Sequence, residues 1–302
     1  MGEDIRRFNG GGAFQVTPME KFAEFGQERV RETPISEAAF IGASITAAIT
    51  GLKPVVELMF VDFAGVCFDQ IYNNAGKMRY MLGSQVKVPL VIRTTMGVGL
   101  SLGATHSQTL YSLFAHCPGL KIVAPSTPYD AKGLLKHAIR NNEDPVMFFE
   151  HRNLYSTIGP VPLTDYTIPF GVAEIRREGS DVTIVATAAM VKKSLAAAKE
   201  LEIDNISAEV IDTRSLVPLD KQMIKKSVEK TSRLVIVDED YGRCGIASEI
   251  AATICEESFE YLRAPVKRVV TPTIPIPFNP KLEDALIPNE KRIISAVKEI
   301  VR

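Results

Sequence analysis

Short apolar runs alternate with amphipathic segments of helical length along the chain, and this alternation restricts the fold more than any other feature. In the first half, the predicted strands cover residues 55–60, 88–94, 120–125 and 145–150. The predicted helices between them cover residues 36–50, 62–81, 107–117 and 127–140. The strands are nearly all apolar, as expected for strands that are covered on both faces. The pattern therefore predicts parallel sheets with helical crossovers.

The alternation stops between Asn153 and Gly171, where Pro160, Pro162 and Pro169 interrupt any helix. It then resumes, with predicted strands at 181–186, 208–212, 233–238 and 266–271. The second set of predicted helices covers residues 190–201, 221–230, 246–259 and 289–301. We expect an α/β protein of two α/β domains, residues 1–155 and 171–302, joined by a linker at 156–170.

Composition argues against several classes of protein. The net charge of the 302 residues is −1, and no run of Lys and Arg is long enough to neutralise several phosphates of a nucleic acid. The four cysteines are scattered without a C-x-x-C spacing, which argues against a disulfide scaffold. The apolar stretches are shorter than the ~18 to 20 residues that cross a bilayer, and the first residues resemble no secretory signal. We therefore expect a cytoplasmic protein without nucleic-acid or membrane partners.

A glycine-rich segment, residues 97–103, imitates two known motifs. Residues 99–103 match the G-x-S-x-G nucleophile elbow of hydrolases, but the predicted strand ends several residues too early for the sharp strand-to-helix turn. The same segment has one residue too many for a dinucleotide fingerprint, and no acidic residue follows at ~20 positions. The four histidines form no zinc motif. We favour a flexible glycine-rich loop near a ligand.

Glu37 and His106 are the two remaining candidates. Ser36 is a natural N-cap, so Glu37 falls in the first turn of a helix made otherwise of apolar and small residues. An acid there can simply stabilise the helix dipole. His106 lies where the glycine-rich segment meets the next helix, and a histidine taken alone in such a place is more often a structural, hydrogen-bonded imidazole than a catalyst.

Several motifs together change this interpretation. They are Thr-Pro-Ile-Ser-Glu at 33–37, Phe-Val-Asp-Phe at 60–63, His-Ser-Gln at 106–108, Phe-Ala-His-Cys-Pro-Gly-Leu at 114–120, the stretch 125–134, and in the second half residues 209–214 and 247–250. They closely resemble the beta subunit of thiamine-diphosphate-dependent 2-oxoacid dehydrogenases. That family includes the first components of the pyruvate, branched-chain 2-oxoacid and acetoin dehydrogenase complexes. The resemblance implies a pyrimidine-binding domain followed by a transketolase C-terminal-like domain.

The resemblance also implies a role for individual residues. Glu37 would hydrogen-bond the ring nitrogen of the cofactor's aminopyrimidine, and Phe63 would stack on that ring. Ile35 and Met59 would line its pocket. His106 would hydrogen-bond the reacting intermediate and assist acyl transfer to lipoamide.

The chain lacks the Gly-Asp-Gly segment with which the family holds the diphosphate through Mg²⁺. We therefore expect an alpha subunit to carry that site in an α2β2 heterotetramer, which would serve a lipoyl-bearing acyltransferase core. Many members bind a structural K⁺ through backbone carbonyls. In this chain the candidates are Ala138, Asn141 and Asp144, and the loop that contains them is one residue longer than usual.

The expected reaction is oxidative decarboxylation of pyruvate or a related 2-oxoacid with transfer of the acyl group to lipoamide. An acetoin dehydrogenase beta subunit is the alternative within the family. A catalytically silent structural partner is a third interpretation, because the chain begins at the Gly-Glu-Asp segment that follows an additional helix in most members.

Overall fold

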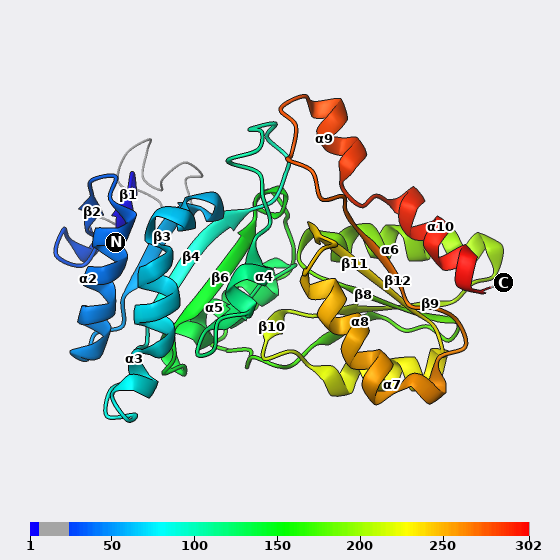
Figure 1. The fold of residues 1–302 in the computed structure, drawn as a ribbon, viewed down its shortest axis with the longest axis horizontal. Helices are drawn as coiled ribbons and strands as arrows, with labels where there is room; N and C mark the ends of the chain where they lie inside the picture. Colours follow the sequence, from blue (N-terminus) through cyan, green and yellow to red (C-terminus); the bar gives the residue numbers. More distant parts are fainter. Residues whose placement is uncertain (6–23, 302) are drawn as a thin grey trace.

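The computed structural model describes residues 1–5 and 24–301, and the chain forms two β-sheets, each with helices on both faces (Figure 1). The two sheets lie side by side, and the helices α4 and α8 face each other between them. Residues 156–170 form neither helix nor strand. No helix in the described ranges is long and apolar enough to cross a membrane.

Within the described ranges, the first sheet has seven strands in the order β10-β5-β6-β4-β3-β1-β2. Its strands are β1 (Gly2–Glu3), β2 (Glu32–Thr33), β3 (Val55–Phe60), β4 (Val91–Met96), β5 (Lys121–Val123), β6 (Val146–His151) and β10 (Ser215–Val217). All pairs are parallel except β10 with β5. The strand β10 comes from the second half of the chain, so the two halves share this sheet.

The second sheet, as far as the chain is described, has five strands in the order β12-β11-β8-β9-β7. They are β7 (Glu174–Arg177), β8 (Val182–Ala186), β9 (Ala208–Asp212), β11 (Leu234–Tyr241) and β12 (Lys267–Thr271). Only the edge strand β7 is antiparallel to its neighbour. The parallel sheets with helical crossovers expected from the sequence are therefore confirmed.

The helices divide the apolar core into layers. They are α2 (Glu37–Ile49), α3 (Gly76–Met81), α4 (Tyr111–Ala115), α5 (Pro128–Arg140), α6 (Ala189–Leu201), α7 (Lys221–Thr231), α8 (Ile246–Glu257), α9 (Pro280–Leu286) and α10 (Glu290–Val301). Side chains of α2, α4, α7 and α8 share one large core that runs under both sheets. Helix α5 covers the other face of the first sheet, and α6 and α10 cover the other face of the second.

The single helix predicted at 62–81 is wrong. A 3₁₀ helix, η2 (Val61–Cys67), is followed by a π-helical segment, η3 (Gln70–Ala75), and only then by α3. The side-chain amides of Asn73 and Asn74 donate to Asp69, four and five residues earlier, with Asn73 bonding its carboxylate and Asn74 its backbone carbonyl. Asparagine side chains compete in this way with regular α-helical bonding.

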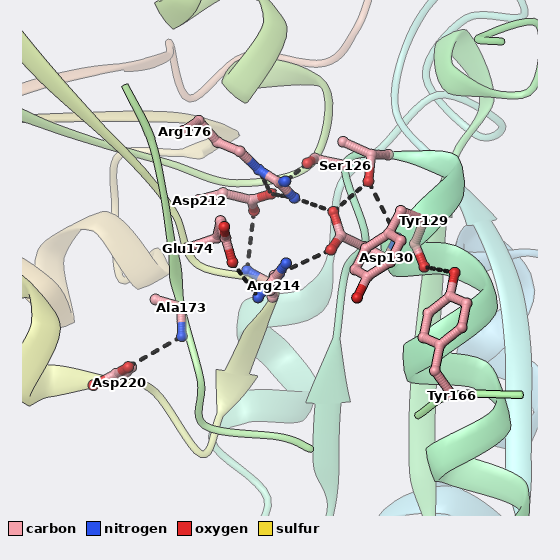
Figure 2. Close-up of polar contacts among 11 residues, drawn as sticks. Ser126, Tyr129, Asp130, Tyr166, Ala173, Glu174, Arg176, Asp212, Arg214 and Asp220 are labelled. Carbon is pink, nitrogen blue, oxygen red and sulfur yellow. Dashed lines mark hydrogen bonds and ion pairs between the residues drawn. The ribbon is translucent and has the colours of Figure 1, made fainter. Parts of the chain in front are cut away.

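Polar contacts between the two halves of the chain gather at the start of α5 (Figure 2). Thr127 caps this helix by accepting a hydrogen bond from the Asp130 amide at 3.1 Å. The fully buried Asp130 carboxylate then pairs with Arg176 of β7 and, at 2.8 Å, with Nε of Arg214. Asp212 accepts from both Arg176 and Ser126. This network joins α5 of the first half to β7 and β9 of the second.

Candidate active site

Glu37 begins helix α2 and is buried, with 8% of its surface exposed. Ser36 occupies the predicted N-cap position, but its hydroxyl makes no capping hydrogen bond. Burial, together with the charge of the nearby Glu37 carboxylate, raises the pKa of the Cys67 thiol to about 12. Burial and the same carboxylate also raise the pKa of Glu3. Glu37 thus lies where α2, η2 and β1 meet.

No side chain in the described ranges satisfies the Glu37 carboxylate by hydrogen bond or ion pair. Its neighbour Ile35 is 78% exposed, which is unusual for a large apolar side chain. A largely buried carboxylate without a protein partner costs free energy unless a ligand supplies the partner.

Phe60, Phe63 and His106 form a compact group of three rings. The ring centroids are 5.3 Å apart for Phe60 and Phe63, 5.1 Å for Phe60 and His106, and 5.2 Å for Phe63 and His106. Each pair meets edge to face, which is a favourable aromatic geometry. The structure therefore brings together two of the residues named from the sequence, Phe63 and His106. Phe60 was missed, although it opens the same Phe-Val-Asp-Phe motif.

The segment that carries His106, residues 97–109, connects β4 to α4 and is here called the His106 loop. Gly97 donates to the Gln108 carbonyl at 2.9 Å and closes the base of this loop. Asp62, between Phe60 and Phe63, accepts from the side-chain amide of Gln108 at 2.8 Å. The Phe-Val-Asp-Phe and His-Ser-Gln motifs are thus in direct contact.

The glycines of this loop serve close packing. Gly97 and Gly99 have φ of +87° and +126°, and a Cβ at these positions would overlap His151 and Asn153 respectively. Ser101 lies five residues after the end of β4, and α4 begins ten residues further on, so the geometry of a nucleophile elbow is absent. No group of three or more His, Cys, Asp or Glu side chains in the described part of the chain could hold a metal ion.

The other predicted site residues form no ring contact or hydrogen bond with the aromatic group. Met59 is half-buried at a register shift between β3 and β4. Ala138 is buried in α5, and Asn141 is the exposed C-cap of that helix. The Asp144 carboxylate pairs with Arg79 at 2.7 Å, and its carbonyl accepts from Asn142. The K⁺ site stays a prediction.

Two family models cover most of the chain. The transketolase pyrimidine binding domain matches residues 1–157, and the transketolase C-terminal domain matches residues 171–293. The acetoin:2,6-dichlorophenolindophenol oxidoreductase subunit beta of Bacillus subtilis is 52% identical over 278 residues, covering 92% of this chain and 81% of that protein. This chain belongs to the family of transketolase-like dehydrogenase beta subunits. It is an enzyme subunit of the thiamine-diphosphate-dependent type.

Other relatives of this beta-subunit family are similar over almost the whole chain. The pyruvate dehydrogenase E1 component subunit beta of Gracilaria tenuistipitata var. liui is 46% identical and covers 100% of this chain and 92% of its own length. The 2-oxoisovalerate dehydrogenase subunit beta of Bacillus subtilis is 43% identical, with coverages of 99% and 91%. Among solved structures, a split gene transketolase described as an inactive beta4 tetramer matches with a TM-score of 0.78 and 26% identity, over 93% of this chain and 86% of that one.

Proposed function

We propose that this beta subunit shares an active site with an alpha subunit. Together the two subunits oxidatively decarboxylate a 2-oxoacid and transfer the acyl group to a lipoyl group. The observation that carries the proposal is Glu37 at the start of α2, which is 8% exposed and whose carboxylate has no hydrogen-bond or ion-pair partner among the described residues, in a fold that also groups Phe63 with His106. A merely structural glutamate would be expected to find a partner within its own chain.

Glu37, Phe63, Ile35 and Met59 are the residues that we expect to hold the pyrimidine end of thiamine diphosphate. When bound, this cofactor supplies a carbon nucleophile and accepts the electron pair that is released when the bond next to the substrate carbonyl breaks. Glu37 would hold a proton at the pyrimidine ring nitrogen, as a carboxyl group in a water-poor site can do. Phe63 would orient the ring by stacking. His106 would donate a hydrogen bond toward the reacting carbonyl oxygen and serve acyl transfer.

The diphosphate end requires residues that this chain lacks, because it has no Gly-Asp-Gly segment. We infer that an alpha subunit holds Mg²⁺ and the diphosphate in an α2β2 heterotetramer, and that the acyl acceptor is the lipoyl-bearing acyltransferase core of a complex. We also propose that Ala138, Asn141 and Asp144 bind a structural K⁺. The proposed location of the protein is cytoplasmic.

Acetoin is the second candidate substrate. Two acetoin oxidoreductase beta subunits, from Bacillus subtilis and Cupriavidus necator, are 52% and 48% identical to this chain, against 43% and 46% for the branched-chain and pyruvate relatives described above. We infer that the alpha subunit contributes part of the substrate pocket.

A substrate comparison tests the proposal. The chain is assembled with its alpha subunit, thiamine diphosphate and Mg²⁺, and reduction of an artificial electron acceptor is followed with pyruvate, branched 2-oxoacids and acetoin. We expect turnover with a 2-oxoacid, and neither subunit alone should turn over. A response to acetoin only moves the assignment to the second candidate. Absence of turnover with every substrate, in an assembled complex that binds the cofactor, contradicts both and favours a silent structural partner.

A further inference from the structure

Four charged side chains from four different elements hold the backbone of the His106 loop. The Val98 amide donates to Glu239 of β11 at 2.9 Å, and the Gly99 amide donates to Glu283 of α9 at 2.5 Å. The Gln108 amide donates to Asp62 of η2 at 3.4 Å. The fourth contact is at His106 itself, where the backbone carbonyl accepts from Nη2 of Arg152.

Arg152 is the only cation of these four and lies directly after β6, in the 3₁₀ turn η4 (Arg152–Leu154). Only 6% of its surface is exposed, and its guanidinium lies over the Phe60 ring, with Cζ 5.3 Å from the ring centroid. The nitrogens Nε and Nη1 are buried and find no hydrogen-bond partner in the described ranges. Burial of a guanidinium costs free energy. The one hydrogen bond that this group forms in the described ranges goes to the backbone carbonyl of His106, the residue with the candidate imidazole.

The charges of the three carboxylates of the group act on this cation. Burial lowers the pKa of Arg152, whereas the charges of Asp62, Glu239 and Glu283 oppose that effect. Each of these carboxylates also accepts a backbone N–H of the His106 loop, as described above. Glu239 is further paired with His151, at 2.9 Å from Nε2 to Oε2. The guanidinium thus brings one positive charge to a group whose three acids bond the backbone of the same loop.

We propose that Arg152 is a positioning residue for His106. It fixes the His106 carbonyl, supports Phe60 against the imidazole, and keeps the three carboxylates together on the backbone of the loop. The inference rests on the proposed function, because the purpose of the positioning is to aim the His106 imidazole at the reacting group. It extends that function to the C-terminal half of the chain, which supplies Glu239 and Glu283.

Amide hydrogen exchange of the full chain tests whether Arg152 stabilises the backbone of the His106 loop, independently of activity. In Arg152→Met the amides of residues 97–109 should exchange about tenfold faster or more, because a charge-assisted bond and its electrostatic support are lost. Amides of β8 should be unchanged. Arg233→Met is the matched control, since Arg233 is partly buried and, like Arg152, donates to a backbone carbonyl, that of Ile300 at 2.7 Å, away from the loop.

Turnover of the complex with the alpha subunit tests the consequence. Arg152→Met should lower kcat about tenfold or more with little change in the KM for substrate, and Arg152→Lys should restore part of kcat because it keeps the cation. Wild-type exchange in the loop of a folded Arg152→Met chain overturns the proposal. Faster exchange with an unchanged kcat overturns it as well, because stabilisation of the loop by Arg152 would then have no effect on the function of His106.

The two proposals can fail separately. A wild-type rate in His106→Ala would contradict the role given to His106 in the proposed function, whatever the exchange result. Faster exchange in Arg152→Met together with that outcome would leave Arg152 a structural support of the loop, and the positioning role would be wrong.

Discussion

Glu57, Arg93 and Glu150 show how single charges are accommodated inside the first sheet. Arg93 on the central strand β4 lies 3.4 Å from Glu57 on β3 and donates to both carboxylate oxygens of Glu150 on β6, at 2.7 and 2.9 Å. Burial raises the pKa of Glu57 to about 7, although the charge of Arg93 opposes this effect. Arg93 therefore interacts more closely with Glu150, to which it donates two hydrogen bonds, than with Glu57.

This arrangement predicts a pH dependence of stability. Between the ordinary pKa of 4.5 and about 7, the folded chain binds more protons at Glu57 than the unfolded chain does. The contribution of Glu57 to the free energy of unfolding therefore falls as the pH rises through this window, by at most about 1.4 kcal/mol per pH unit. Glu57→Gln should remove that slope in urea denaturation measured from pH 5 to 8. Glu143→Gln, at an exposed ion pair with Lys87, is the control; an identical slope in Glu57→Gln and wild type would contradict the assignment.

The residues of the candidate site differ in how far the sequence could reveal them. Glu37, Phe63 and His106 stand in local motifs, so their positions could be named before the fold was known. Arg152, Glu239 and Glu283 could not, because their contacts with the His106 loop span from 46 to 184 residues of sequence. Local pattern carries no information about such long-range pairings, which depend on how the two halves of the chain pack.

At the scale of elements, strands and helices with a strong apolar period were predicted well. The bounds of β3 and β9 match the expected 55–60 and 208–212, and α5 and α7 differ by one residue at one end. Short edge strands such as β7 and β10 were missed, because they are too short to display a period. The segment 62–81 was assigned the wrong helix type, since its apolar positions fit an α-helix while its asparagines bond backward to Asp69.

The N-cap of α5 gives a prediction at this scale. Thr127 accepts from the Asp130 amide and donates to the Asp130 carboxylate at 2.5 Å. Thr127→Ala should lower the free energy of unfolding by about 1 to 2 kcal/mol, as for other lost caps. Thr127→Ser keeps the hydroxyl and should cost far less. Urea denaturation followed by circular dichroism measures both, and equal losses in the two variants would show that the methyl group rather than the cap matters.

At the scale of the whole molecule, buried polar contacts join the two halves at two places. One is the network of Asp130, Arg176 and Arg214 at the start of α5 (Figure 2). The other is formed by three consecutive acids of β11, in which Asp238 accepts from Tyr111, Glu239 pairs with His151, and Asp240 accepts from Ser112. A buried charge that loses its partner is strongly destabilising. We therefore expect these contacts to determine the position of the second sheet relative to the first. The His106 loop lies against the second of these places.

The central claim is that this chain contributes an essential carboxyl group to an active site that an alpha subunit completes. The most direct test is the turnover of Glu37→Gln in the reconstituted complex, because the amide keeps the shape of the side chain but cannot exchange a proton with a ring nitrogen. We expect turnover to fall by about 100-fold or more, which corresponds to a loss of about 2.7 kcal/mol of transition-state stabilisation, with assembly and melting temperature unchanged. Turnover within a factor of two of wild type, in a complex that assembles normally, would contradict the claim.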